Sequence, residues 1–353
     1  MTRSKHLSSR RRACGLLVSG LCAVGLLLGG AAQAQDLKER TLRMSFVNVK
    51  DHPHGIGAER FAELVSQKSG GKLTVKLYPG GTLGSDMQTV SSLQGGTIDL
   101  SVMVPGSLTG VSKDFGVFDL PFLFNSAQEA DAIVDGPFGR KLLDHLPEKS
   151  LVGLAYWDHG FRNMTTGKKP IVTADDFQGL KLRVQQIPIY IDMMKALGAN
   201  PLPLPFTELY TALENGTVDG QDNPLTSIVG SKLYEAQKYL SITRHTYNPL
   251  VVLVSKKTWD RLLPAEHKIL VDAANEAKPY QRKVSRDAEA KALDTIKAAG
   301  LKVNEVSPTE IERMREKVQP AADKFGREAG DSLVKELRAE VVRVRGETQA
   351  RNR

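Results

Sequence analysis

Residues 41–103 read TLRMSFVNVKDHPHGIGAERFAELVSQKSGGKLTVKLYPGGTLGSDMQTVSSLQGGTIDLSVM, and they alternate between strand-like and helix-like segments. The apolar spacing predicts strands over 41–49, 73–78 and 98–103, and helices over 54–69 and 86–93. Glycine pairs follow both helices and end them. Two β-α-β units of this kind predict a mostly parallel sheet covered by helices, which is the architecture of an α/β protein.

The same alternation continues along the rest of the chain. Further strands are expected over 151–157, 181–184, 250–255 and 302–306, and further helices over 187–197, 207–214 and 265–299. In the last of these, small and apolar residues recur every three or four positions for about ten turns, which is typical of a long amphipathic helix. Thr207 is the expected N-cap of the helix over 207–214. Pro320 is expected to interrupt the C-terminal helical stretch, and residues 335–353 are expected to fray.

The first 34 residues have the anatomy of an export signal. A basic stretch reaches Arg12, an apolar run spans 14–28, and small residues end in Ala-Gln-Ala at Ala34. The apolar run is shorter than the roughly 20 residues that cross a bilayer, so we expect cleavage between Ala34 and Gln35 rather than a membrane anchor. Twin arginines in the basic stretch leave twin-arginine export open beside the general secretory route. The mature chain is expected in the periplasm.

Removing this leader changes what the composition implies. The whole chain has 48 Lys and Arg against 40 Asp and Glu, and five of those cations lie in the leader, which leaves 43 against 40, a net charge of +3. Without a basic stripe interleaved with aromatic residues, this charge gives no footprint for nucleic acid. Both cysteines, Cys14 and Cys22, also lie in the leader. The mature chain therefore has neither a disulfide nor thiol chemistry.

Motifs of catalysis are missing from the sequence. It contains no H-E-x-x-H, G-x-S-x-G or Walker loop. The one dense cluster is His52-Pro53-His54 next to Asp51, but the proline puts this pair in a turn and no third metal ligand is marked nearby. An ordinary turn or capping role, a contact to a ligand and a metal site all stay open for these histidines. We expect no metal, no cofactor and no enzymatic activity.

A series of short sequence motifs distinguishes this chain from other α/β proteins. Between 151 and 249 they are AYW (155–157), GFR (160–162), GLKLRV (179–184), LGANP (197–201), PFTELYTAL (205–213), VDGQDNP (218–224) and YEAQKYL (234–240); before residue 151 they are LYP (77–79), TLG (82–84), GGTID (95–99) and FDLPF (118–122). In this order they resemble the DctP-type substrate-binding proteins of tripartite ATP-independent periplasmic (TRAP) transporters, over essentially the whole mature chain.

The resemblance implies a two-lobed α/β protein that closes like a clam around an organic anion. A long helix would span both lobes, and the protein would deliver its ligand to a small and a large membrane permease subunit driven by an ion gradient. We expect lobe I to comprise residues 35–158 and 249–288, and lobe II with the C-terminal helices to comprise 159–248 and 289–345, followed by a tail over 346–353. The hinge is expected near 157–161 and 248–251.

The resemblance also assigns binding residues in lobe II. Arg183 matches the family's principal carboxylate-binding arginine, and a guanidinium suits that task because its parallel N–H groups match two carboxylate oxygens. Arg162 matches the second arginine, and Asn223 matches a polar contact beside the hinge. Each has a plainer interpretation: Arg162 as an exposed strand residue, Arg183 as an ion-pair partner of Asp176 or Glu208, and Asn223 as a turn former.

Lobe I is expected to supply the remaining contacts. Asp86 matches an acid on the ligand side, although it could equally be the N-cap or a first-turn acid of the helix over 86–93. Asn48 and His54 are pocket candidates in the first strand-to-helix loop. Phe206, from lobe II, stands where some family members pack an aromatic ring against the ligand, and core packing is its alternative.

The substrate class is less specified than the family. Several motifs look most like the branch of the family that binds sugar acids such as diketogulonate, uronates and aldonates. FDLPF also fits the C4-dicarboxylate branch. A C4-dicarboxylate needs a second cation, and His54 is a candidate for it. Two further alternatives are an exported lyase or hydrolase of sugar acids, with His54 and Asp86 as acid and base, and a receptor for a sensor kinase.

Overall fold

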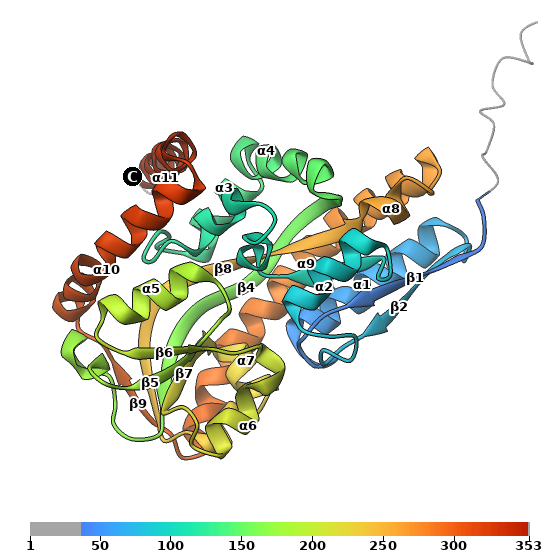
Figure 1. Ribbon diagram of the computed structural model, residues 1–353. Coiled ribbons are helices and arrows are strands. Elements are labelled where there is room, and N and C mark those ends of the chain that lie inside the picture. Colours follow the sequence, from blue (N-terminus) through green and yellow to red (C-terminus); the bar gives the residue numbers. More distant parts are fainter. Residues whose placement is uncertain (1–36, 352–353) are drawn as a thin grey trace, which may run out of the picture. The chain divides into compact units, whose positions relative to one another are not determined.

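The computed structural model describes residues 37–351, and the expected leader lies outside this range (Figure 1). The first β-α-β units form as predicted: β1 (Arg40–Ser45), α1 (Pro53–Lys68), β2 (Leu73–Tyr78), α2 (Asp86–Gly95) and β3 (Leu100–Met103). Short 3₁₀ helices η1 (Pro105–Leu108) and η2 (Lys113–Asp119) follow, then α3 (Ala127–Val134), α4 (Pro137–His145) and η3 (Leu146–Lys149).

The second half repeats the alternation. Its elements are β4 (Leu151–Thr166), η4 (Ala174–Phe177), β5 (Lys181–Val184), α5 (Pro188–Ala196), β6 (Asn200–Pro203), η5 (Phe206–Glu208), α6 (Leu209–Glu214), β7 (Gly220–Pro224), α7 (Leu225–Gly230), η6 (Leu233–Ala236) and β8 (Tyr239–Ser255). The chain ends with α8 (Lys256–Trp259), α9 (Pro264–Ala298), β9 (Lys302–Glu305), α10 (Pro308–Ala329) and α11 (Asp331–Arg351).

All nine described strands belong to one mixed sheet with the order β2-β1-β3-β8-β4-β7-β5-β6, and β9 pairs with β8. The outer pairs are parallel, whereas β3 with β8, β8 with β4, and β4 with β7 are antiparallel. Parallel strands β1 and β3 therefore build one lobe and β5 and β7 the other. The long strands β4 and β8 run through both and join them (Figure 1).

These two joining strands are much longer than the sequence predicts. The predicted strand 151–157 continues to Thr166, and the predicted strand 250–255 begins at Tyr239. Their added segments carry buried polar residues, such as Arg162 in β4 and His245 in β8, which broke the apolar pattern. Pairing slips between Asp158 and Gly160, and Gly160 has a φ of +110°, which favours glycine. This irregularity lies within the expected hinge.

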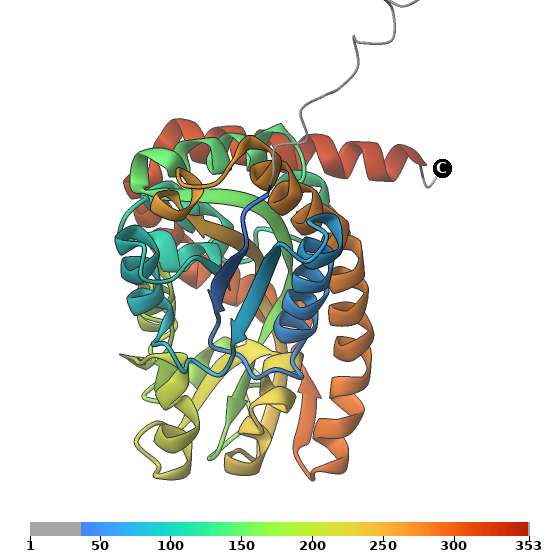
Figure 2. The ribbon, with the colours of Figure 1, turned by 90° about the vertical axis from the view of Figure 1, so that its right-hand side faces the viewer.

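The long helix α9 confirms the prediction for 265–299 and packs on α1, β4 and α7 (Figure 2). Gln281 fastens it to β4, because its side-chain oxygen accepts from the Asp158 backbone N–H at 2.8 Å and its amide donates to the Asp158 carbonyl at 2.7 Å. Trp157 adds a bond from its indole nitrogen to the Ala274 carbonyl at 3.2 Å. The helix therefore follows the joining strand rather than one lobe alone.

Three local predictions near the chain's end and in lobe II are wrong. Helix α10 runs through Pro320, whose side is exposed, so water can satisfy the carbonyl that the proline leaves without a donor. Residues 335–351 are helical rather than frayed, because α11 packs on α3 and α4 and Arg345 pairs with Glu129 at 2.7 Å. Thr207 lies inside η5 and caps no helix; a 3₁₀ turn follows Pro205 before α6 begins.

These findings also bear on the expected boundaries. Helix α11 reaches Arg351, so it includes residues 346–351 of the segment that was expected to be a tail, and it packs on α3 and α4 as well as on α10. The lobe boundaries stay a prediction. In the range 37–351, no helix is both long enough and apolar enough to span a membrane.

Candidate functional site

A cavity lies where the two lobes meet, at the carboxyl ends of β1, β3, β5 and β7. Open α/β sheets bind their ligands at this edge. The lining includes all seven residues that the sequence singled out: Asn48, His54, Asp86, Arg162, Arg183, Phe206 and Asn223. Its volume of about 50 Å³ has room for only a few water molecules, so an organic ligand needs the lobes or side chains to move apart.

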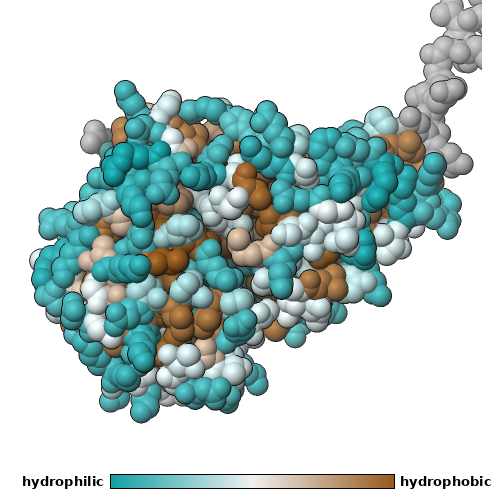
Figure 3. Space-filling view, in the orientation of Figure 1, coloured by the Kyte–Doolittle hydropathy of each residue, from teal (hydrophilic) through white to brown (hydrophobic). Residues whose placement is uncertain are grey.

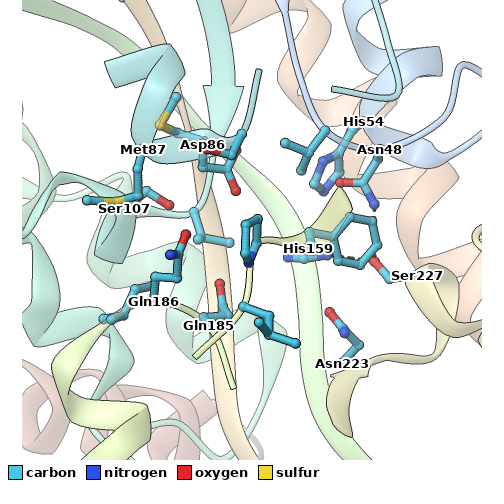
Figure 4. Close-up of a pocket in the computed structure, with 18 of the residues that line it drawn as sticks. Asn48, His54, Asp86, Met87, Ser107, His159, Gln185, Gln186, Asn223 and Ser227 are labelled. Carbon is cyan, nitrogen blue, oxygen red and sulfur yellow. Dashed lines mark hydrogen bonds between the residues drawn. The ribbon is translucent and has the colours of Figure 1, made fainter. Parts of the chain in front are cut away.

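The face of the molecule that Figure 3 shows is mostly hydrophilic, with apolar residues gathered toward its middle. Figure 4 shows polar side chains converging on the cavity from several elements. Asn48 comes from the β1–α1 connection, His54 lies in the first turn of α1, Asp86 begins α2, and Asn223 lies near the end of β7. Polar groups that converge in this way can orient a small polar ligand and set its specificity.

Arg183, in β5, is a buried cation without a carboxylate partner. Its side chain is 2% exposed, its Nε donates to the Leu204 carbonyl at 2.9 Å, and its Nη1 has no hydrogen-bond partner. Within the described chain, no carboxylate oxygen lies within 4.0 Å of its guanidinium nitrogens, so neither Asp176 nor Glu208 pairs with it. Burial, together with the nearby charge of Arg162, lowers the Arg183 pKa to about 10. The site therefore holds a guanidinium that no carboxylate contacts directly.

Arg162, in β4, is equally buried, but its charge is compensated. Its side chain is 1% exposed, which rules out the exposed strand residue considered from the sequence. Its Nε contacts Asp222 Oδ2 at 2.5 Å, and its other nitrogens donate to the Asp222 carbonyl and to Asn248 Oδ1. Burial opposes ionisation of Asp222, yet Arg162 and His245 hold its pKa well below the usual range. Arg162 thus resembles a structural anchor that borders the cavity.

Asn223 and Phe206 border the cavity next to these arginines. Asn223 is buried in β7, where its backbone pairs with Asn163 and its amide donates to Gln221 Oε1 at 2.5 Å. It is therefore a strand residue and not the turn former considered from the sequence. Phe206 is only half-buried, and its ring centroid lies 6.0 Å from the Arg183 guanidinium carbon. That position lines the cavity rather than the core.

Asp86 is not the N-cap of α2, but it is an acid in the first turn of this helix, the other part of its alternative. Ser85 is the N-cap of α2 and forms a reciprocal capping box with Gln88, so the Asp86 carboxylate lies in the first turn and faces the cavity. Burial raises the Asp86 pKa to about 6, while the charge of Arg183 opposes this rise. An acid in this position can accept a hydrogen bond from a ligand hydroxyl.

The structure adds lining residues that sequence reasoning missed. They are polar side chains from four elements: Ser107, His159, Gln185, Gln186 and Ser227. His159 lies next to His52 and His54. Sequence analysis did not find this third histidine of the cluster because it lies in β4, far from the other two along the chain. One nitrogen from each of the three rings lies within 4.8 Å of the others. His52 itself caps α1, accepting the His54 backbone N–H at 3.1 Å.

Comparison with known proteins settles the family. The family model described as bacterial extracellular solute-binding protein, family 7 (DctP), matches residues 44–328. The chain belongs to this family. Family 7 proteins bind solutes for transport and are not enzymes, so the exported lyase or hydrolase, with His54 and Asp86 as acid and base, is set aside.

Individual relatives and solved structures match this chain over most of their length. A TRAP periplasmic solute-binding protein from Ochrobactrum anthropi is 53% identical, with 88% of this chain and 97% of that chain covered and a TM-score of 0.79. The sugar acid binding protein DctPAm from Advenella mimigardefordensis strain DPN7T, solved in complex with galactonate, is 43% identical, with 88% and 100% covered and a TM-score of 0.86. The 2,3-diketo-L-gulonate-binding periplasmic protein YiaO of Escherichia coli K12 is 34% identical, with 91% and 93% covered.

Proposed function

We propose that the mature chain is the periplasmic binding component of a TRAP transporter and that it binds a hydroxylated monocarboxylate, a sugar acid such as an aldonate or uronate. The observation that carries the proposal is Arg183, a buried guanidinium with one nitrogen unpartnered at the junction of the lobes. A carboxylate that enters this cavity leaves water, and charge-assisted bonds to Arg183 repay that loss.

The charge of the lining favours one carboxylate over two. Of the two cations among the described lining residues, Arg162 is already paired with Asp222, and Arg183 alone lacks a carboxylate. A C4-dicarboxylate needs a second cation, for which His54 was the candidate. Burial lowers the His54 pKa well below its usual value, so its ring is neutral near pH 7. The C4-dicarboxylate alternative therefore lacks a partner for its second charge.

Known relatives support the same substrate class. The DctPAm structure holds galactonate, and YiaO is named for 2,3-diketo-L-gulonate. YiaO is also named as periplasmic, which supports a periplasmic location for this chain. Export through the leader at 1–34, with cleavage near Gln35, is part of the same proposal. On this proposal the closed protein presents its ligand to the small and large membrane subunits of the permease.

A thermal-shift series on refolded, ligand-stripped chain 35–353 tests the proposal. Aldonates and uronates are compared with C4-dicarboxylates and with the uncharged alditols that match the aldonates. A ligand at 1,000 times its dissociation constant adds about 4 kcal/mol of stability. We expect large shifts with one or more sugar acids and none with the alditols. Shifts confined to the C4-dicarboxylates would replace the proposed substrate class, and equal shifts with acid and alditol would refute the carboxylate clamp.

A further inference from the structure

Three histidines and a serine form a buried cluster at one side of the cavity. His52 and His54 belong to the start of α1, His159 to β4 and Ser227 to α7. All four are buried, and the rings meet edge to face, with centroids 4.4 Å apart for His52 and His54 and 4.5 Å apart for His54 and His159. In Figure 4 the labelled members His54, His159 and Ser227 gather with Asn48, across the cavity from Asp86.

The hydrogen bonds of this cluster fix where its protons lie. His52 Nδ1 accepts the His54 backbone N–H, so a neutral His52 carries its proton on Nε2 and donates it to Ser227 Oγ, 3.2 Å away. The Asn48 amide donates to the same oxygen at 3.3 Å. Both lone pairs of Ser227 Oγ are then used, and its own proton points to the remaining neighbour, His159 Nε2, at 3.0 Å. His159 therefore accepts at Nε2 and carries its proton on Nδ1.

The cluster leaves several imidazole nitrogens without a partner. His159 Nδ1 has none, and neither nitrogen of His54 has one, although both residues are buried and line the cavity. A buried N–H or nitrogen lone pair without a partner costs about 1 to 3 kcal/mol. A ligand group that both donates and accepts can satisfy them, and a hydroxyl does both.

We infer that His52 and Ser227 act as positioning residues that hold His159 with its proton on Nδ1, and that His159 and His54 form a subsite for a hydroxyl group of the ligand. The inference rests on the proposed function and deepens it. The carboxylate would contact Arg183, and the histidine subsite would select acids that carry a hydroxyl at the matching distance. Because burial keeps all three rings neutral, this subsite offers no charge to a second carboxylate.

A metal ion fits the same cluster less well. Each histidine ligand must offer a nitrogen lone pair, but His52 uses the lone pair of Nδ1 for the His54 backbone and holds a proton on Nε2. The candidate nitrogens are also spread over as much as 4.8 Å. Two nitrogens bound to one zinc at about 2.0–2.1 Å lie roughly 3.4 Å apart in a tetrahedron. A metal would therefore need His52 to give up the α1 cap.

Paired ligands test the subsite. Calorimetry compares a hydroxylated acid, the aldonate with the largest thermal shift, with the unsubstituted carboxylic acid of the same chain length. In His159→Phe we expect the aldonate to bind about 10- to 100-fold more weakly and the unsubstituted acid to stay within threefold of its wild-type affinity. His159→Asn, which keeps an N–H near the Nδ1 position, should recover part of the loss. His145→Asn changes a half-exposed histidine outside the cavity and is the control.

The tautomer itself is measurable without any variant. Nitrogen NMR of histidine-labelled wild-type protein should show His159 protonated on Nδ1, and Ser227→Ala should remove this preference. A proton on Nε2 in the wild type, an equal loss for both ligands in His159→Phe, or zinc binding that depends on His52 would each overturn the inference. If the wild type binds no organic acid, the proposed function fails; if it binds acids and the His159 variants keep full selectivity, only the subsite fails.

Discussion

Replacing Arg183 by alanine removes the one lining cation that has no carboxylate partner in the described chain. Burial, together with the charge of Arg162, lowers the Arg183 pKa from 12.5 to about 10. At 1.36 kcal/mol per pKa unit, this shift corresponds to about 3 kcal/mol that the protein spends to keep the guanidinium charged without a ligand. A bound carboxylate recovers this energy, so the free protein is predisposed to accept an anion.

The loss on removal follows from the same geometry. In Arg183→Ala a ligand carboxylate would enter the cavity with no charged partner, and breaking a buried ion pair from one side costs roughly 3 to 5 kcal/mol. That energy corresponds to a dissociation constant raised roughly 150- to 5,000-fold. Arg183→Lys keeps the charge but loses the parallel pair of N–H donors, so its loss should be intermediate.

Isothermal titration of the stripped protein measures this effect directly. Arg60→Ala is the matched control, since Arg60 is on the surface of α1, pairs with Glu63 at 3.2 Å and does not line the cavity. Without ligand, Arg183→Ala should unfold no earlier than the wild type, because the variant no longer buries a lone charge. Binding within threefold of the wild type in Arg183→Ala would refute the clamp.

Three further predictions concern stability. Burial raises the pKa of Asp119, the last residue of η2, to about 7, so between about pH 4 and pH 7 the folded state holds a proton that the unfolded state has released. Stability should therefore fall by about 1 to 3 kcal/mol between pH 5 and pH 7, and Asp119→Asn should remove this fall in calorimetric scans at pH 5 and pH 7; the same fall in both proteins would contradict it. Asp222→Ala strands the buried Arg162 and should cost roughly 3 to 5 kcal/mol in urea unfolding, with Asp222→Asn less damaging; a loss below 1 kcal/mol would show that the pair is dispensable. Gln281→Ala removes both side-chain hydrogen bonds to the Asp158 backbone and should lower the free energy of unfolding by about 1 to 3 kcal/mol. An unchanged free energy of unfolding would show that other contacts are enough to hold α9.

Local pattern was enough to predict α1, α2, α5, α6 and α9 and the parallel strands β1, β2, β3, β5 and β9, whereas β6, β7 and the helices α3, α4, α7 and α8 were not predicted. Helix α9 shows why, because its small and apolar residues follow one face for its whole length and pack on α1 and β4. The joining strands were underestimated for a physical reason. Their central residues, such as Arg162, are buried by polar partners rather than by apolar packing, and a hydropathy pattern does not contain those partners.

Tertiary contacts account for the errors at the C-terminus. The charged sequence after residue 335 looks solvated when it is considered alone, yet Arg345 reaches Glu129 of α3 across the fold. Pro320 is tolerated because its side of α10 faces water. Neither feature can be recognised from the neighbouring sequence, so sequence analysis had no basis for placing α11 against α3 and α4.

The candidate site likewise contains some residues that were predicted from the sequence and some that were missed. Arg183 and Asn223 were found through words that resemble a family, and the structure places both in the cavity lining. His159 and Ser227 were missed, because their roles depend on hydrogen bonds between α1, β4 and α7 that are distant in sequence. The pairing of Arg162 with Asp222 was also invisible, since 60 positions separate the two residues.

The most direct test of the central claim is a crystal structure of chain 35–353 with the sugar acid that gives the largest thermal shift. The account predicts the ligand carboxylate on the Arg183 guanidinium, with N···O distances of about 2.7–2.9 Å and Nη1 engaged. A bound acid whose carboxylate lies on other groups, with Arg183 still unpartnered, would contradict the account.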